Sequence, residues 1–241
     1  MNLSKEIADW IKKQVEKAHK KGILFGLSGG VDSAVVAYLA GLAAGDNALG
    51  LILPCKNDPK DVELALAVAQ KFNIKTKEVA LDNIFDELVN IYPEANNLAK
   101  GNLKPRLRMA VLYYFANTFD YLVVGTGNKS EIAIGYFTKY GDGGADILPL
   151  GGLLKTEVRE LAKEIGVPDE IIKRPPSAGL WHGQTDESEI GITYEELDKI
   201  IKALERNKTE GIDKETLQKV KKMIANSEHK RTKIPMFGGV K

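Results

Sequence analysis

Short apolar runs alternate with helix-like segments through the first half of this chain. Each run is long enough for one buried strand, and each following segment has the length and composition of a helix. Parallel strands need crossovers of this kind, so the order predicts an α/β fold: a doubly wound parallel sheet between two layers of helices. The predicted strands are Ile23–Leu27, Ala48–Leu53, Thr76–Leu81 and Tyr121–Val124. The predicted helices are Ala34–Ala43, Asp61–Phe72, Phe85–Ile91 and Leu107–Phe119.

The second half has fewer strand-like runs and two polar, glycine- or proline-containing loops. These loops are residues 137–150 and 175–190, and long loops in compact domains are often functional. Further helices are predicted at 156–165, 169–173, 194–205 and 214–225. We therefore expect one domain over residues 1–241, with an N-terminal helix at about 3–20 and a C-terminal helical tail at about 193–228.

Composition narrows the class of protein. The 34 Lys and Arg residues balance 33 Asp and Glu residues, so the net charge does not predict a nucleic-acid partner. No apolar segment has the length of a membrane span or a signal peptide, which predicts a cytoplasmic protein without membrane contact. The one cysteine, Cys55, follows an apolar run and is expected to be a buried, unreactive thiol.

The strongest local motif is the run Ser28-Gly29-Gly30-Val31-Asp32-Ser33, here called the glycine turn, between a predicted strand and a predicted helix. Backbone N–H groups and the positive end of the helix converge there, which favours an anion such as phosphate. The carboxylate of Asp32 would repel that anion unless a divalent cation lies between them. We therefore predict that Asp32 is a Mg²⁺ ligand. A plain tight turn with a capping side chain is the structural alternative.

The glycine turn resembles the pyrophosphate-binding loop of the ATP pyrophosphatases, and it lacks the Gly-Lys-Ser/Thr of a Walker loop. Several later segments resemble, in order, those of ammonia-dependent NAD synthetases. They are residues 125–131, 137–146 and 148–150, Lys155, and residues 176–178, 183–187 and 228–231. The resemblance covers essentially the whole chain and implies an adenine nucleotide alpha hydrolase-like fold.

The same resemblance implies a reaction and a set of site residues. Deamido-NAD would attack the α-phosphate of ATP, and ammonia would then displace AMP from the adenylate to give NAD. The implied ATP-binding residues are Gly26, Leu27, Ser28, Gly29, Gly30, Val31, Asp32, Ser33, Thr126, Lys155 and Ser177. Asp32 and Glu131 would bind Mg²⁺. Arg106, Lys139, Asp146, His229 and Lys230 would bind deamido-NAD, in a homodimer that shares this site between subunits.

Adenylation brings a carboxylate towards a polyphosphate, so cations must offset the repulsion. Mg²⁺ and Lys155 can do this, and Lys155 is therefore a candidate catalytic residue. The acidic Asp146, the second candidate catalytic residue, is expected to orient a ring or polarise the incoming ammonia. Taken alone, Lys155 would be an ordinary first-turn residue of a helix and Glu131 a solvent-facing glutamate.

Three other functions are compatible with parts of the sequence. Another amide synthetase of the ATP pyrophosphatase class would share the glycine turn but not the segment 139–146. A non-catalytic ATP-binding module would not need Asp32, Glu131 and Lys155 together. A dinucleotide oxidoreductase is suggested by Gly125-Thr126-Gly127, but Ser130 stands at the third glycine position of that fingerprint. The chain contains no plausible glutaminase cysteine, so free ammonia is the expected nitrogen donor.

Overall fold

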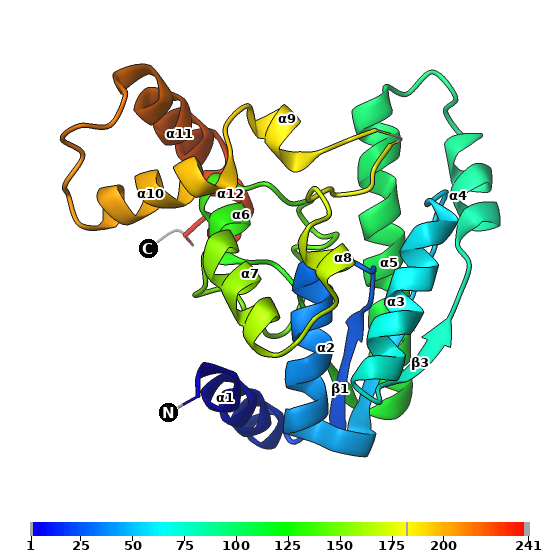
Figure 1. Ribbon diagram of the computed structural model, residues 1–241. Helices are drawn as coiled ribbons and strands as arrows, with labels where there is room; N and C mark the ends of the chain where they lie inside the picture. Colours follow the sequence, from blue (N-terminus) through cyan, green and yellow to red (C-terminus); the bar gives the residue numbers. More distant parts are fainter. Residues whose placement is uncertain (1, 182, 239–241) are drawn as a thin grey trace.

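The computed structural model describes residues 2–181 and 183–238. Its sheet has four parallel strands in the order β3-β2-β1-β4. The strands are β1 (Gly22–Gly26), β2 (Ala48–Ile52), β3 (Lys75–Glu78) and β4 (Tyr121–Val124). A doubly wound parallel sheet with helices on both faces is therefore confirmed (Figure 1).

Twelve α-helices and one short 3₁₀ helix are assigned within the described residues. In the first half they are α1 (Leu3–Lys17), α2 (Val31–Ala44), η1 (Gly45–Asn47), α3 (Pro59–Lys71), α4 (Asp82–Val89) and α5 (Asn97–Phe119). In the second half they are α6 (Lys129–Ile134), α7 (Lys155–Glu164), α8 (Asp169–Ile172), α9 (Asp186–Ile190), α10 (Tyr194–Glu205), α11 (Lys214–Asn226) and α12 (Glu228–Arg231).

The side chains of β1 alternate between two cores, as expected for a strand covered on both faces. Ile23 and Phe25 pack into the core that contains residues of α1, α2, α3 and α7. Leu24 packs into the opposite core, which contains residues of α5 and Cys55. The sheet is therefore fixed on both sides, and its carboxyl edge is a rigid platform for loops.

The C-terminal helices form a separate cluster beside α6 and α7 (Figure 1). Tyr194, Leu197 and Ile201 of α10 are buried there with Ile134 of α6 and Val220 of α11. This contact matters for the site because α6 and α7 both begin at the carboxyl edge of the sheet.

Several predicted element boundaries differ from the structure. Helices α2 and α4 begin at Val31 and Asp82, before the predicted starts at Ala34 and Phe85, and α9 lies inside the predicted loop 175–190.

Two further differences occur at α5 and at the third strand. Helix α5 begins at Asn97, ten residues before the predicted start at Leu107, and it continues through Pro105. Its Gly101 packs closely against Leu180 and Trp181, so tertiary contact outweighs the poor helix propensity of glycine and proline here. The third strand is assigned only as far as Glu78, although the sequence predicts an end at Leu81. The amides of Val79 and Leu81 still donate to the carbonyl oxygens of Ile52 and Pro54, at 2.9 and 2.8 Å, so the extended pairing continues beyond the assigned strand.

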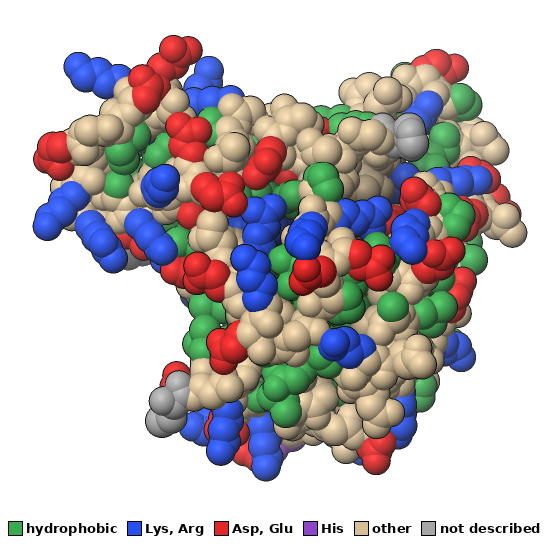
Figure 2. All heavy atoms as spheres, in the orientation of Figure 1, with side chains coloured by type: hydrophobic (Ala, Val, Ile, Leu, Met, Phe, Trp, Pro, Cys, Tyr) green, Lys and Arg blue, Asp and Glu red, His purple; other side chains and the backbone are tan. Residues whose placement is uncertain are grey.

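The charges on the surface agree with the near-zero net charge of the sequence. Lysine, arginine, aspartate and glutamate side chains are interspersed over the face in Figure 2. In the part of the chain that is described, no helix is both long and apolar enough to cross a membrane.

Candidate active site

A cavity of about 740 Å³ opens at the carboxyl ends of β1, β2 and β4. Its lining includes the glycine turn except Gly29, the start of α7, Arg174 and residues 175–181 of the second polar loop. Open parallel sheets bind ligands at this edge, where neighbouring crossovers leave in opposite directions. Helices α2 and α3 pack on one face of the sheet, whereas α5, which leads into β4, packs on the other. The cavity therefore lies where the fold predicts a ligand, beside the junction of β1 and β4.

The glycine turn is shaped by its backbone and two hydroxyl groups. Gly29 has a φ of 80°, and a Cβ at this position would lie 2.5 Å from the carbonyl oxygen of Asp61. Ser33 Oγ donates to the Gly30 carbonyl oxygen at 2.9 Å and accepts from the Ser28 amide at 3.2 Å. Helix α2 starts directly after Gly30 and has no side-chain cap, so its first amides remain available to an anion.

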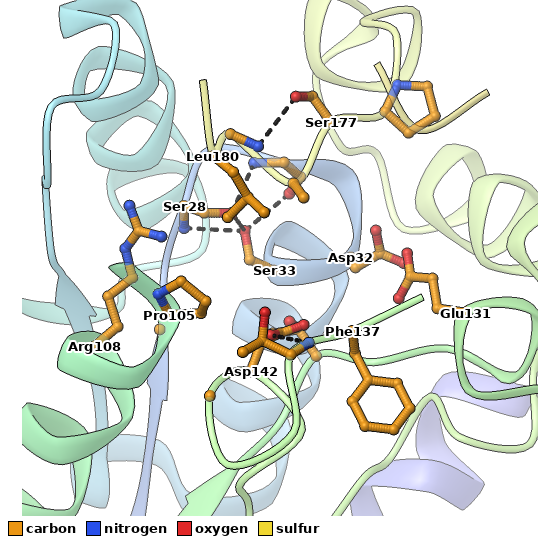
Figure 3. A pocket seen from close by; sticks show the side chains of 18 of the residues that line it. Ser28, Asp32, Ser33, Pro105, Arg108, Glu131, Phe137, Asp142, Ser177 and Leu180 are labelled. Carbon is orange, nitrogen blue, oxygen red and sulfur yellow. Dashed lines mark hydrogen bonds between the residues drawn. The ribbon is translucent and has the colours of Figure 1, made fainter. Parts of the chain in front are cut away.

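Beside this turn, Asp32, Glu131 and Lys155 form what we call the charge cluster. Lys155 Nζ donates to Asp32 Oδ2 at 2.5 Å and to Glu131 Oε1 at 3.1 Å. Asp32 and Glu131 approach each other on one side of the cavity, while Arg108 of α5 lies on the opposite side (Figure 3). The cluster therefore joins α2, α6 and α7 through buried charges.

Burial and the ion pairs shift the proton affinities of this cluster. Burial raises the pKa of Glu131 to about 7, against the opposing attraction of Lys155. Burial alone would lower the pKa of Lys155, but the Asp32 and Glu131 carboxylates outweigh it and raise this pKa above its ordinary value. Lys155 is therefore a fixed positive charge at neutral pH.

Two polar residues hold the charge cluster in place. Asn128 donates from Nδ2 to Asp32 Oδ1 at 2.9 Å and caps α6 by accepting the Glu131 amide at 3.1 Å. Asp198 of α10 accepts the Ser130 hydroxyl and, at 2.9 Å, the Thr156 amide. Ser130 Oγ in turn accepts the Lys155 amide at 2.9 Å. Asp198 thus fixes the helix starts that carry Glu131 and Lys155.

Comparison with known proteins identifies the family. The family model described as NAD synthase matches residues 3–234. An NH(3)-dependent NAD(+) synthetase from Methanocaldococcus jannaschii is 51% identical over 95% of this chain and 94% of its own. One from Finegoldia magna is 48% identical over 95% of this chain and 92% of its own. A solved NMN synthetase from Francisella tularensis has a TM-score of 0.90 at 37% identity, covering 99% of this chain and 98% of its own.

The chain belongs to the NAD synthase family. The family resemblance predicted from the sequence is confirmed, and with it the ligase class that forms a C–N bond. Assignment to another amide synthetase class or to an oxidoreductase is wrong.

The residues predicted to contact ATP gather around the cavity. Its lining includes every member of that set except Gly29, which packs behind the turn against Asp61: Gly26, Leu27, Ser28, Gly30, Val31, Asp32, Ser33, Thr126, Lys155 and Ser177. Ser177 comes from the second polar loop and lies above Asp32 in the view of Figure 3. Its hydroxyl accepts the Gly179 amide at 3.1 Å.

The residues predicted to contact deamido-NAD divide into three places. Lys230 lines the cavity and donates to the carbonyl oxygens of Gly135 and Phe137, both at 2.8 Å. Lys139 Nζ donates to the His229 carbonyl oxygen at 2.5 Å, and Arg106 Nε donates to the Lys139 carbonyl oxygen at 3.4 Å. Arg106, Lys139 and His229 form what we call the basic group, which lies outside the lining of the cavity.

Asp146 is placed differently. Its Oδ2 accepts the Val123 amide at 2.8 Å and its Oδ1 accepts the Tyr113 hydroxyl at 3.0 Å. It is an exposed residue outside the lining of the cavity. Its contacts attach the loop after residue 144 to the end of β4.

The pair Asp32 and Glu131 fits a magnesium ion. Mg²⁺ is usually held by one or two carboxylates together with substrate phosphates and water. These two carboxylates already converge on a positive charge, the ammonium of Lys155, beside the glycine turn. Within residues 2–181 and 183–238 there is no group of three or more metal-ligating side chains, so the substrate would have to complete the coordination.

Sequence reasoning missed Asn128, Asp186 and Asp198 as site residues. The sequence does contain a signal for Asp198. It lies on the same face of α10 as Tyr194, Leu197 and Ile201, where an apolar residue is expected. A carboxylate at a core position of that kind needs buried donors, and here they are at the start of α7.

Proposed function

We propose that this protein converts deamido-NAD into NAD with ammonia and ATP, releasing AMP and pyrophosphate through an adenylate intermediate. The observation that carries the proposal is one cavity that joins the glycine turn to the charge cluster. Relatives 51% and 48% identical to this chain are NH(3)-dependent NAD(+) synthetases.

The geometry suits the adenylation step. The amides at the start of α2 would hold the β- and γ-phosphates, which leave together as pyrophosphate. Lys155 supplies a permanent positive charge within reach of the same space. We propose that Asp32 and Glu131 hold Mg²⁺, which would neutralise the polyphosphate when bound. Because these groups are fixed before the reaction, little reorganisation is needed as charge moves to the leaving group.

The dinucleotide would occupy the side of the cavity towards the basic group. Arg106, Lys139, His229 and Lys230 lie close together there and suit the diphosphate of deamido-NAD. The roles of these residues and of Asp146 remain predictions. So does a cytoplasmic location, which fractionation of producing cells would check.

We also propose a homodimer. Large apolar side chains on and beside α4 and α5 are exposed, including Ile91 at 76%, Leu98 at 59% and Tyr114 at 70%. Exposed apolar side chains along these two helices favour coverage by a second protein surface. Sedimentation equilibrium should give about twice the chain mass of 26.4 kDa.

Ammonia is the proposed nitrogen donor. Glutamine hydrolysis needs a reactive nucleophile such as a cysteine, and Cys55 is the only cysteine of the sequence. It is buried, and burial raises the pKa of its thiol, which opposes thiolate formation. We therefore expect efficient NAD formation with ammonium and poor formation with glutamine.

A second candidate differs only in substrate. The Francisella tularensis protein, 37% identical to this chain, is an NMN synthetase. The same chemistry on the mononucleotide acid would give NMN, and the basic group outside the cavity would then have no second nucleotide to contact. The higher identity to the NAD(+) synthetases favours the dinucleotide.

The decisive experiment is incubation of the purified protein with ATP, Mg²⁺ and ammonium, and with deamido-NAD or nicotinate mononucleotide in parallel. AMP, pyrophosphate and the amide product should appear in equal amounts, with deamido-NAD giving the higher kcat/KM. A higher kcat/KM with the mononucleotide would select the second candidate. Amide formation without pyrophosphate would contradict both.

A further inference from the structure

Arg108 of α5 is a cation of the cavity that the proposed mechanism does not yet use. It is a half-buried residue of the cavity lining and lies on the side opposite Asp32 and Glu131 (Figure 3). Its Nε donates to the Leu53 carbonyl oxygen at 3.1 Å, and its Nη2 donates to Asn57 Oδ1 at 2.7 Å. Both acceptors are neutral groups of the segment after β2, so they fix the guanidinium without neutralising its charge.

The guanidinium has N–H groups left for a ligand. Arginine carries five N–H donors in a planar fork, and Nη1 of Arg108 donates to no described residue. Among the described residues, the only side-chain nitrogen or oxygen that is both buried and without a hydrogen-bond partner belongs to Asp186. Nη1 of Arg108 therefore keeps accessible surface and is open to a ligand in the cavity.

This charge also has no acidic partner. No described carboxylate forms an ion pair with Arg108, whereas Arg174, the other arginine of the lining, pairs with Asp61 at 2.6 Å. Asp142 of the lining acts on Arg108 through space, without a direct contact. Burial lowers the pKa of Arg108, as expected for a cation without a counter-ion, although arginine keeps its proton in proteins. An anionic ligand would supply the missing charge.

The direction of the adenylation step indicates which anion this is. In phosphoryl transfer the attacking and leaving oxygens lie roughly in line with the phosphorus atom. The leaving pyrophosphate would be held beside the charge cluster, on one side of the glycine turn. The attacking carboxylate must then approach the α-phosphate from the other side, where Arg108 lies (Figure 3).

We propose that Arg108 binds the carboxylate of the pyridine acid and holds it in line with the α-phosphate of ATP. This rests on the proposed function and assigns a binding residue for its acid substrate. A guanidinium matches the two oxygens of a carboxylate and offsets the charge that approaches the polyphosphate. NAD carries a neutral carboxamide at the same place, so this contact would distinguish the substrate from the product.

The step balances without proton transfer. One carboxylate oxygen attacks the α-phosphorus, so an O–P bond forms. The bond from the α-phosphorus to its bridging oxygen breaks, and the electron pair leaves with pyrophosphate. Arg108 keeps all of its protons and donates to the carboxylate oxygen that does not attack.

Lys230 is the rival for this role, because it also lines the cavity and pairs with no described carboxylate. Two of its N–H groups already donate to the carbonyl oxygens of Gly135 and Phe137. It also follows His229 of the basic group directly, on the side proposed for the diphosphate. The structure therefore favours Lys230 for the diphosphate and Arg108 for the carboxylate.

The test compares the affinities for acid and amide in wild type and Arg108→Met. Deamido-NAD and NAD are titrated calorimetrically with Mg²⁺ and α,β-methylene-ATP present, so that the ATP site is filled and nothing reacts. Wild type should bind deamido-NAD about 10- to 100-fold more tightly than NAD, as expected for charged hydrogen bonds. In Arg108→Met the two affinities should lie within about threefold of each other. Damage to the segment after β2 would weaken both ligands equally and leave this ratio unchanged.

Arg106→Met is the matched control, since Arg106 lies on the same helix and is predicted to contact the diphosphate that both ligands share. It should weaken both ligands and keep the wild-type ratio, and Lys230→Met should do the same. A wild-type ratio in Arg108→Met, or a ratio lost in Lys230→Met instead, would overturn the assignment. Equal affinities of wild type for the two ligands would overturn it as well.

Arg108→Lys decides the matter if Arg108→Met does not fold. Lysine keeps the charge but lacks the planar fork, so the ratio should fall about 3- to 10-fold. An unchanged ratio in this variant would then contradict the assignment. If the mononucleotide is the better substrate, nicotinate mononucleotide and NMN replace the pair of ligands. If wild type makes no amide product and binds no acid, the proposed function fails instead, so the two failures are distinguishable.

Discussion

The glycine turn and the charge cluster lie side by side in one cavity, yet they are built in opposite ways. The turn is six consecutive residues whose binding groups are backbone amides and two hydroxyls. The cluster joins side chains from α2, α6 and α7, and Lys155 is 123 positions away from its partner Asp32. A local motif is set by backbone conformation, whereas a cluster of buried charges depends on the packing of the whole domain.

This difference predicts where substitution costs most. Without a ligand, the amides at the helix start are hydrated by water. The glycine turn therefore costs the protein little unfolding free energy, provided that its residues can adopt the backbone conformation of the turn. The charges of the cluster have been removed from water, and each one depends on the others. The substitutions below compare the two regions, starting with the largest expected effect.

Lys155→Ala should have the largest effect, because it leaves two buried carboxylates facing each other. Removing one partner of a buried ion pair costs about 3 to 5 kcal/mol of unfolding free energy. Turnover should fall at least about 100-fold, since a charge that offsets the polyphosphate is lost. Urea unfolding and steady-state NAD formation measure the two effects.

Lys129→Ala is the matched control for a lysine at a helix start. Its ion pair with Glu205 is at the surface, with side chains 30% and 51% exposed, and should contribute less than about 1 kcal/mol. Equal losses of stability in the two variants would mean that the charge cluster is not the more sensitive region.

Gly29→Ala tests the turn itself. Alanine is strained at a φ of 80°, and its Cβ would lie 2.5 Å from the Asp61 carbonyl oxygen, a backbone atom that cannot move alone. We expect a loss of at least about 2 kcal/mol in unfolding free energy. The KM for ATP should rise at least about 10-fold, since the amides shift as well.

Gly152→Ala provides the comparison within the same loop-rich edge. Nothing lies within 4 Å of a Cβ placed there, so stability and the KM for ATP should stay near wild type. If Gly29→Ala were as mild as this control, the close packing of the turn against α3 would not determine its shape.

The contrast also explains how much the sequence could predict. The turn, β1, β2, β4 and α10 were predicted closely because they depend on runs of neighbouring residues. The start of α5 was missed because Gly101 and Pro105 oppose a helix locally, while packing against Leu180 favours it. Lys155 and Glu131 were placed in the same site only through the family resemblance, and their ion pair was not predicted, since nothing local indicates that they meet.

Asp186 and Asp198 mark the limit of that prediction. Each is an acid in a polar segment or an amphipathic helix, where a solvated face is the ordinary expectation. Their burial follows from the docking of α9 and α10 against α6 and α7, which the order of elements alone does not specify.

Asp198→Asn is expected to have an intermediate effect. Asparagine can accept one of the two hydrogen bonds, but its amide nitrogen is a donor and would face another donor at the start of α7. A buried group left unsatisfied costs about 1 to 3 kcal/mol. Turnover should fall about 10-fold, because Lys155 and Glu131 lose a shared support.

Asp213→Asn is the control, because Asp213 caps α11 at the surface and asparagine caps helices equally well. It should leave stability and turnover unchanged. A stability loss in Asp198→Asn without any change in turnover would limit Asp198 to a structural role.

The last expected effect, similar in size to that of Asp198→Asn on stability, is a pH dependence of the charge cluster. The pKa of Glu131 is raised to about 7 in the folded protein from an ordinary value of 4.5, so the folded state holds this proton more tightly. Metal-free protein should therefore lose stability as the pH rises from about 4.5 to 7, by roughly 1 to 3 kcal/mol. Lys155 does not contribute in this window, because its raised pKa acts only above pH 10.5.

Unfolding free energies of wild type and Glu131→Gln, measured across this range with a chelator present, isolate the effect. Groups outside the cluster contribute equally to both proteins, so the difference between the two curves reports Glu131 and the neighbours whose charges it affects, Asp32, Lys155 and Asp186. The curves should converge at low pH, where Glu131 is protonated, and separate towards pH 7 with the variant more stable. Parallel curves would show that Lys155 fully compensates the buried carboxylate of Glu131. The charge cluster, like the glycine turn, would then cost the ligand-free protein no stability.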